Sequence, residues 1–231
     1  MFPKPPDLSL VDPFDGFGPG ERPACRMAGW GGEFGEAEEA MLSEAERARA
    51  GRMKSAARRS EMIASFLLRR WLVAEMTACN AEEVRFDAQE NGAPVLLAPS
   101  GHAVSVANKQ ALTVVALDRA GATIGVDVEI VRETEWRPIL ATICDDGERT
   151  DFLVRYSKSS DALSAFFRMW TLKEAVLKTT GQGFRAGPKA VRVFPGDVGG
   201  QGSGTLTAFG ATFDYWTADQ GDAVVSLARR R

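Results

Sequence analysis

Two short stretches decide the fold of this chain. The first is Ile124-Gly125-Val126-Asp127-Val128-Glu129-Ile130, and the second is Trp170-Thr171-Leu172-Lys173-Glu174-Ala175-Val176-Leu177-Lys178. Together they place three carboxylates and two lysines among apolar residues. Because a buried charge is costly unless it is paired or binds a metal, we expect a functional site where the two stretches meet.

The first stretch has the period of a β-strand. Its branched apolar residues alternate with Gly125, Asp127 and Glu129, so the two carboxylates point to the same side of the sheet. Neighbouring carboxylates repel each other unless a cation or a shared proton joins them. A hard divalent ion such as Mg²⁺ suits this pair. Taken alone, the strand also fits a polar edge that faces solvent.

The second stretch belongs to a helix that we predict from Asp161, a candidate N-cap, to a stop at Gly181. Apolar residues cover nearly its whole circumference, which predicts a mostly buried helix. Glu174 and Lys178 are four positions apart and share one face of it. Taken alone, they fit an ordinary helical ion pair equally well.

Together the two stretches resemble the signature of the 4′-phosphopantetheinyl transferases of the long, single-chain type. That signature is a Gly-hydrophobic-Asp-x-Glu strand, followed some forty residues later by an aromatic residue, a small residue, any residue, and then Lys-Glu-(Ala/Ser)-x-x-Lys. Its first part is matched by Gly125, Asp127 and Glu129, and its second part by Trp170, Thr171, Lys173, Glu174, Ala175 and Lys178. Asp127 and Trp170 are 43 positions apart (170 − 127), which agrees with the family's spacing.

The pattern of helices and strands predicts the α+β class. The resemblance further implies two similar lobes in a pseudo-twofold arrangement, each a long helix on a small, mostly antiparallel sheet, with the active site between them. We therefore expect an extended N-terminal arm over residues 1–38, an N-terminal lobe over 39–119 and a C-terminal lobe over 120–231.

Local signals place the other elements. Ser43 and Glu46 form a Ser-x-x-Glu capping box that begins a helix. Further helices are predicted over 56–79 and over 136–153, the latter with a polar break at 144–148. Strands are predicted over 24–30, 83–87, 95–97, 103–107, 111–117, 123–130, 190–194, 204–208, 212–217 and 223–228. Residues 196–204 are expected to be a flexible loop and 229–231 a frayed tail.

The activity implied by the resemblance is Mg²⁺-dependent transfer of 4′-phosphopantetheine from coenzyme A to a serine of an apo acyl or peptidyl carrier protein, releasing 3′,5′-ADP. In that scheme Asp127, Glu129 and Glu174 bind the metal and Lys178 contacts the phosphate that is attacked. Lys173 neutralises the carboxylates or touches a phosphate. Glu148, in the polar break, accepts the serine proton, with a metal-bound water as the alternative base.

The resemblance also implies residues that hold coenzyme A, namely Arg47, Arg59, Gly92, Ala93, Pro94, Asn108, Lys109, Lys173 and Lys178. The sequence departs from the family there. Ala107-Asn108-Lys109 replaces a Ser-His-Ser element, Ala93 replaces the lysine of a Gly-Lys-Pro turn, and Glu44 replaces a lysine of the opening helix. Lys109, Arg47 and Arg59 are candidates to compensate as phosphate donors. Without such compensation, coenzyme A binds weakly or another pantetheine donor is preferred.

Composition excludes several classes. The formal net charge of −3 (28 − 31) gives no general basicity for nucleic acid, and the single His102 excludes multi-histidine metal sites. Three widely spaced cysteines are typical of a reducing cytoplasm rather than a disulfide framework. No apolar run approaches the roughly 18 residues of a membrane helix. We expect a cytoplasmic monomer that binds neither nucleic acid nor membrane.

A basic run between Arg47 and Arg70 is opposed only by Glu61. It fits a solvated helix surface, a phosphate-binding surface or a dock for an acidic carrier protein. Two alternatives to the enzyme stay open. One is a transferase relative that binds carrier or pantetheine without turnover, and the other is a metal-dependent phosphohydrolase that uses the same carboxylates.

Overall fold

The computed structural model describes residues 10–17, 22–30, 36–89 and 92–231. It is an α+β fold of helices and antiparallel sheets, as predicted. In chain order its elements are η1 (Asp15–Phe17), β1 (Ala24–Gly29), α1 (Glu36–Ala40), α2 (Glu44–Gly51), α3 (Ala56–Thr77), β2 (Arg85–Ala88), β3 (Pro94–Ala98), β4 (Ala103–Lys109), β5 (Leu112–Asp118), β6 (Ile124–Ile130), α4 (Trp136–Ile143), α5 (Asp146–Tyr156), α6 (Ala162–Thr179), η2 (Gly183–Ala186), η3 (Pro188–Ala190), η4 (Pro195–Val198), β7 (Gly202–Ala208), β8 (Ala211–Gln220) and β9 (Ala223–Arg230).

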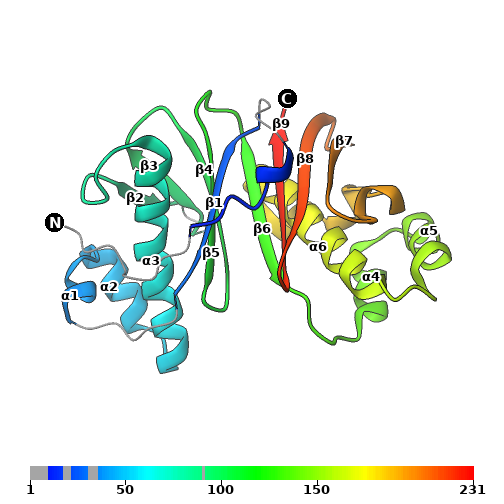
Figure 1. The fold of residues 1–231 in the computed structure, drawn as a ribbon, viewed down its shortest axis with the longest axis horizontal. Coiled ribbons are helices and arrows are strands. Elements are labelled where there is room, and N and C mark those ends of the chain that lie inside the picture. Colours follow the sequence, from blue (N-terminus) through cyan, green and yellow to red (C-terminus); the bar gives the residue numbers. More distant parts are fainter. Residues whose placement is uncertain (1–9, 18–21, 31–35, 90–91) are drawn as a thin grey trace.

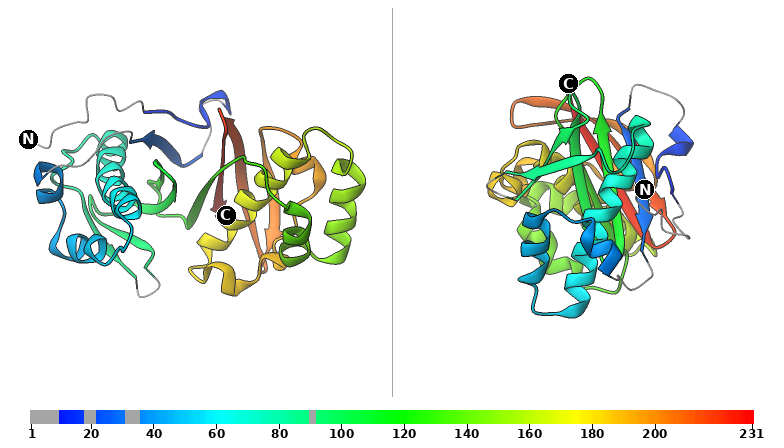
Figure 2. Two further views of the ribbon diagram at one scale, coloured as in Figure 1. Left: turned by 90° about the horizontal axis from the view of Figure 1, so that it is seen from below. Right: turned by 90° about the vertical axis from the view of Figure 1, so that its left-hand side faces the viewer.

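Two antiparallel sheets stand at the centre of the molecule (Figure 1). The first has the strand order β1-β5-β4, and the second has the order β6-β9-β8-β7. A separate hairpin pairs β2 with β3. The long helix α3 lies on the outer face of the first sheet, and α6 lies on the outer face of the second (Figures 1 and 2).

The inner faces of the two sheets pack against each other, and we call this contact region the seam. Strand alternation explains it, because every second residue of each strand points inward. On β6 these are Ile124, Val126 and Val128, and they form one buried cluster with Val114 and Ala116 of β5 and with residues of β1, β4, β8 and β9. In the seam, Ser105 of β4 accepts a hydrogen bond from the backbone N–H of Val126 at 3.0 Å.

The predicted arm contributes to the fold. Strand β1 pairs along its whole length with β5, and Phe14 is fully buried in the seam. Within the predicted arm of residues 1–38, described residues therefore pack against the sheets, while 1–9, 18–21 and 31–35 lie outside the described residues. The lobe boundaries at 39–119 and 120–231, and the pseudo-twofold relation between the lobes, stay predictions.

Most predicted elements have observed counterparts, and the capping box of Ser43 and Glu46 is confirmed. Residues 136–153 form two helices separated at Cys144 and Asp145, as the polar break predicts. The short helix α1 was not predicted. Asp161 stands at the N-cap of α6 but makes no capping hydrogen bond there, because its carboxylate accepts from Arg168 at 2.9 Å instead.

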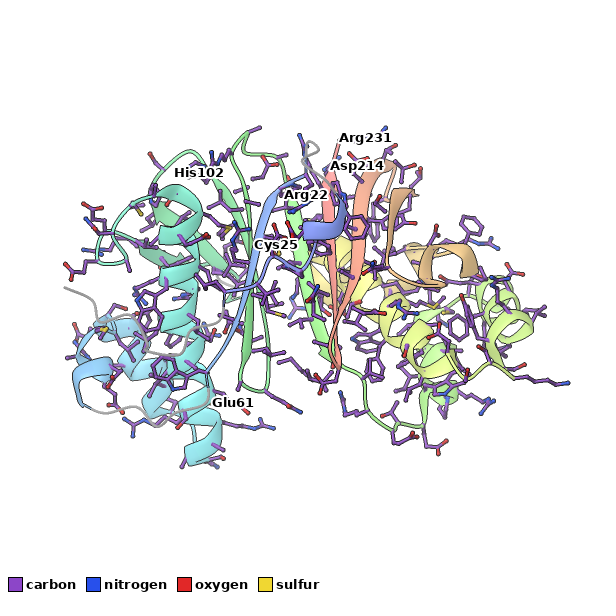
Figure 3. The ribbon with its side chains drawn as sticks, in the orientation of Figure 1. Arg22, Cys25, Glu61, His102, Asp214 and Arg231 are labelled. Atoms are coloured by element: carbon purple, nitrogen blue, oxygen red, sulfur yellow. The ribbon has the colours of Figure 1, made fainter. Side chains whose placement is uncertain are left out.

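Three predictions near the end of the chain were wrong. Residues 190–194 form no strand, although Val191 and Val193 are fully buried, because side chains rather than a neighbouring strand bond their backbone. The 196–204 loop contains η4 and the start of β7. The tail is not frayed, because β9 continues to Arg230 and Arg231 donates to Asp214 at 2.6 Å (Figure 3).

None of the helices in the described part of the chain has both the length and the apolar character needed to cross a membrane.

Candidate active site

The site begins with a close contact between β6 and α6. A Cβ atom on Gly125 would lie 1.9 Å from the carbonyl oxygen of Ala175 and 3.0 Å from Cβ of Lys178. Any side chain at this position would therefore push the helix away from the strand. Glycine brings the helix that carries Glu174 and Lys178 directly onto the strand that carries Asp127 and Glu129.

Lys178 joins the two elements at the edge of β6. Its Nζ donates to Asp127 Oδ1 at 2.9 Å and to the carbonyl oxygen of Val126 at 2.7 Å. Burial raises the pKa of Asp127, while the Lys178 ammonium opposes that shift and the Glu129 carboxylate adds to it. Asp127 is therefore a desolvated carboxylate that depends on a cation for its charge.

Glu129 is held by two cations. Lys109, the last residue of β4, lies 2.9 Å from its Oε1 and 2.7 Å from its Oε2. Arg132 lies 3.2 Å from Oε2. Lys109 belongs to the first sheet and Glu129 to the second, so this ion pair crosses the seam.

Glu174 completes the group of carboxylates. Burial raises its pKa to about 7; Asp127 adds to the shift, Lys178 opposes it and Glu129 adds further. All three carboxylates thus lie within electrostatic reach of one another. No hydrogen bond or ion pair reaches the Glu174 carboxylate from the residues that the structure describes.

The donor chemistry of these oxygens fits a hard cation such as Mg²⁺. Across residues 10–17, 22–30, 36–89 and 92–231, no three Cys, His, Asp or Glu side chains already stand in metal-binding geometry. Two of the three carboxylates are instead held by lysine ammonium groups. A divalent ion must therefore compete with Lys178 and Lys109 for their oxygens.

A buried chain of hydroxyl groups, which we did not predict, fixes α6 against the sheet. Thr171 and Ser226 are 2.8 Å apart, and Ser226 and Thr217 are 3.1 Å apart. All three are fully buried, and Ser226 is the cross-strand partner of Asp127. These hydrogen-bonded hydroxyl groups fix the position of α6 beside the carboxylates. Their sequence signal is the small hydroxyl residue Thr171, two positions before Lys173.

The structure does not bring Glu148 and Lys173 to the carboxylates, and it pairs the two side chains with each other instead. Lys173 Nζ donates to Glu148 at 2.8 Å and to the carbonyl oxygens of Pro188 and Val191. Glu148 also accepts from the backbone N–H of Val193 at 2.7 Å, and its side chain is fully buried. In this arrangement Glu148 serves as the partner of Lys173, and its role as the base stays a prediction.

Apart from Lys173 and Lys178, the residues predicted to hold coenzyme A lie in the first half of the chain. Gly92 adjoins α2, since a Cβ on it would lie 3.6 Å from Nη2 of Arg49. Arg47 is exposed, and Arg59 forms an ion pair with Glu39 at 3.0 Å. Asn108 accepts from the hydroxyl of Thr113 at 3.0 Å. Ala93 directly precedes β3 and Pro94 is the first residue of that strand, while Asn91 of the same turn lies outside the described residues.

The basic run does not form one continuous surface. Arg69 and Arg70 are buried and bind Glu46 at 2.5 and 2.6 Å. They hold α2 on α3 and leave the surface to the exposed residues Arg47, Arg49, Arg52, Lys54, Arg58 and Arg59. Glu61, the single acid of the run, lies near the start of α3 (Figure 3).

Comparison with known proteins agrees with this geometry. A family model described as the 4′-phosphopantetheinyl transferase superfamily matches residues 123–228. The 4′-phosphopantetheinyl transferase psf-1 of Bacillus pumilus is 30% identical over 122 residues, which cover 52% of this chain and 50% of that protein. The 4′-phosphopantetheinyl transferase HetI of Nostoc sp. is 31% identical over 147 residues, which cover 62% of this chain and 61% of that protein.

The chain thus spans between 50% and 61% of the length of these curated relatives. The matched range holds Asp127, Glu129, Glu174 and Lys178, whereas Asn108 and Lys109 precede it. Residues 123–228, which include Gly125 at the contact between strand and helix, are similar to the 4′-phosphopantetheinyl transferase superfamily.

Proposed function

We propose that this protein transfers the 4′-phosphopantetheine group from coenzyme A to a serine of an apo acyl or peptidyl carrier protein, releasing 3′,5′-ADP. The observation that carries the proposal is the meeting of Asp127, Glu129 and Glu174 beside Lys178 at the edge of β6. Three acids and a lysine in electrostatic contact suit a reaction of a charged diphosphate, which needs positioning and charge stabilisation.

In the proposed reaction the serine Oγ forms a bond to the phosphorus that carries pantetheine, and the bond from that phosphorus to the leaving 3′,5′-ADP breaks. Lys178 donates to the phosphate that is attacked and stabilises its growing charge. Asp127, Glu129 and Glu174 would hold Mg²⁺, which when bound neutralises charge on the diphosphate. Glu174 is also our candidate acceptor of the serine proton, through a carboxylate oxygen that the metal would leave free, because its side chain is less buried than that of Glu148.

Exposed arginines in the first half of the chain are candidate contacts for the donor and for the carrier. Arg47, Arg49 and Arg59 are exposed, Arg49 lies beside Gly92, and all three suit the phosphates of coenzyme A. The exposed arginines of α2 and of the start of α3 also suit an acidic carrier. We also propose that the protein is a monomer and acts in the cytoplasm.

The test is incubation with coenzyme A, Mg²⁺ and a series of apo carrier domains, followed by intact mass measurement. We expect the carrier to gain one phosphopantetheine arm, and a chelator to stop the gain until Mg²⁺ is restored. Asp127→Ala should lower the rate by at least about a hundredfold while the protein still folds. Asp151→Ala removes a half-exposed aspartate of α5 and should leave the rate unchanged.

Other outcomes identify the alternatives. Binding of coenzyme A without any mass gain on the carriers would indicate a binding module without turnover. Release of free phosphopantetheine in the absence of carrier would indicate a phosphohydrolase. Full activity of Asp127→Ala would contradict the metal assignment.

A further inference from the structure

Lys109 is the residue of the first sheet that contacts the cluster of three carboxylates. Its Nζ contacts both oxygens of Glu129, at 2.9 and 2.7 Å. The Lys109 side chain is 27% exposed and that of Glu129 is 15% exposed, so the pair is sheltered but accessible. It also connects two different sheets, since β4 and β6 are not joined by a strand ladder.

This ion pair and a bound cation compete for the same oxygens. An ammonium that bonds both oxygens of Glu129 leaves them poorly available to a hard divalent ion. A cation that takes Glu129 leaves Lys109 without its partner, because Glu129 is the one carboxylate paired with Lys109 within the described residues. A sheltered ammonium without a counter-charge is costly, and an anion is its natural replacement.

We propose that Lys109 passes from Glu129 to an anionic group of the phosphate-bearing donor when a divalent cation binds the carboxylates. The identity of the donor rests on the proposed function. Binding of the cation then prepares the site for the anion, and binding of the anion frees Glu129 for the cation. Such coupling is reciprocal, so each ligand tightens the other by the same factor.

The proposal predicts opposite shifts in a single variant. Lys109→Met keeps an unbranched apolar side chain and removes the charge. Mg²⁺ alone should bind about two- to fivefold more tightly, because it no longer displaces a partly exposed ion pair. Binding of 3′,5′-ADP in the presence of Mg²⁺ should weaken by about tenfold, because a charge-assisted hydrogen bond is lost. A residue that is only structural would weaken both.

The experiment is calorimetric titration of the full chain with Mg²⁺ and with 3′,5′-ADP, each alone and each in the presence of the other. The wild type should show mutual tightening, and Lys109→Met should show much less. Lys158→Met removes an exposed lysine in the turn after α5 and should change neither affinity. Arg132→Met removes a cation bound to the same carboxylate from within the second half of the chain, and should keep the coupling.

An unchanged or weakened affinity for Mg²⁺ in Lys109→Met overturns the proposal, as does mutual tightening equal to that of the wild type. If Lys109→Met melts well below the wild type, Lys109→Gln is titrated in its place with the same expectations. Failure of this inference is distinguishable from failure of the proposed function. If the wild type modifies carriers but Lys109→Met does not bind Mg²⁺ more tightly than the wild type, the inference alone is defeated. A wild type that modifies no carrier while Lys109→Met still tightens Mg²⁺ defeats the transferase and leaves the competition at Glu129 standing.

Discussion

At the scale of the residue, a missing side chain matters as much as the charged ones. Gly125 lets α6 lie on β6 so closely that a Cβ would stand 1.9 Å from the carbonyl oxygen of Ala175. The glycine of the Gly-x-Asp-x-Glu pattern therefore has a packing reason, which is the approach of the helix that supplies Glu174 and Lys178.

Gly125→Ala should destabilise the protein by about 2–4 kcal/mol, because helix and strand must separate to relieve a backbone contact. Chemical denaturation measures the loss. Gly200→Ala places its methyl group in open space and should change the free energy of unfolding by less than about 1 kcal/mol. Equal stabilities for the two variants would show that α6 does not depend on this contact.

Glu174 should make the stability of the metal-free protein depend on pH. Its folded-state pKa of about 7 lies above its ordinary value of 4.5, so its contribution to stability is fully present below pH 4.5 and is lost as pH rises through 7. Glu174→Gln cannot ionise and should be more stable than the wild type at pH 8. For this partly exposed group we expect about 1–2 kcal/mol after allowing for solvent screening. Denaturation at pH 5 and pH 8, with a chelator present, measures the difference, which should nearly vanish at pH 5.

At the scale of the element, buried polar groups decide how the segments after α6 are held. The run 190–194 has the alternation of a strand, yet Lys173 and Glu148 bond its backbone and keep it against α6 and α5. Pattern alone could not foresee this, because the two side chains come from different helices.

Lys173→Met should cost about 3–5 kcal/mol of stability, because it leaves the Glu148 carboxylate buried without its cation. Adding Glu148→Gln to that variant should recover part of the loss, which a double-mutant cycle measures. Glu148→Gln alone should lower stability but keep most of the transfer rate per folded molecule. Normal stability with a lost rate would support Glu148 as the base and contradict a purely structural role for it.

At the scale of the whole molecule, the seam joins two helix-covered sheets and includes the start of the chain. Phe14 is fully buried there, and the bridge between Val11 and Met27 ties its segment to β1. The Pro- and Gly-rich composition of this region predicts irregular backbone, but it carries no information about burial.

Phe14→Ala should therefore destabilise the protein by about 3–5 kcal/mol, as expected when a fully buried aromatic ring is removed. Phe194→Ala removes a ring that is 55% exposed and should change stability by less than about 1 kcal/mol. Thermal and denaturant melts of the two variants make the comparison. A wild-type melting curve for Phe14→Ala would show that this segment contributes little to the stability of the fold.

The sequence by itself determined the local features of this protein. The alternation of Val126, Asp127, Val128 and Glu129 specified a strand with two carboxylates on one side, and the capping box of Ser43 and Glu46 specified where a helix begins. These features depend on neighbours a few residues apart, so periodicity and capping express them directly. The motifs of the two stretches and their spacing indicated the family. The range 123–228, which matches the family model, contains both stretches.

The tertiary structure alone decided which charges meet. Three lysines and one arginine have different partners: Lys178 binds Asp127, Lys109 binds Glu129 across the seam, Lys173 is buried with Glu148, and Arg70 is buried with Glu46. Each partner lies at least 20 positions away along the chain. An ion pair at that separation depends on how helices and sheets pack, and local sequence patterns do not specify that packing.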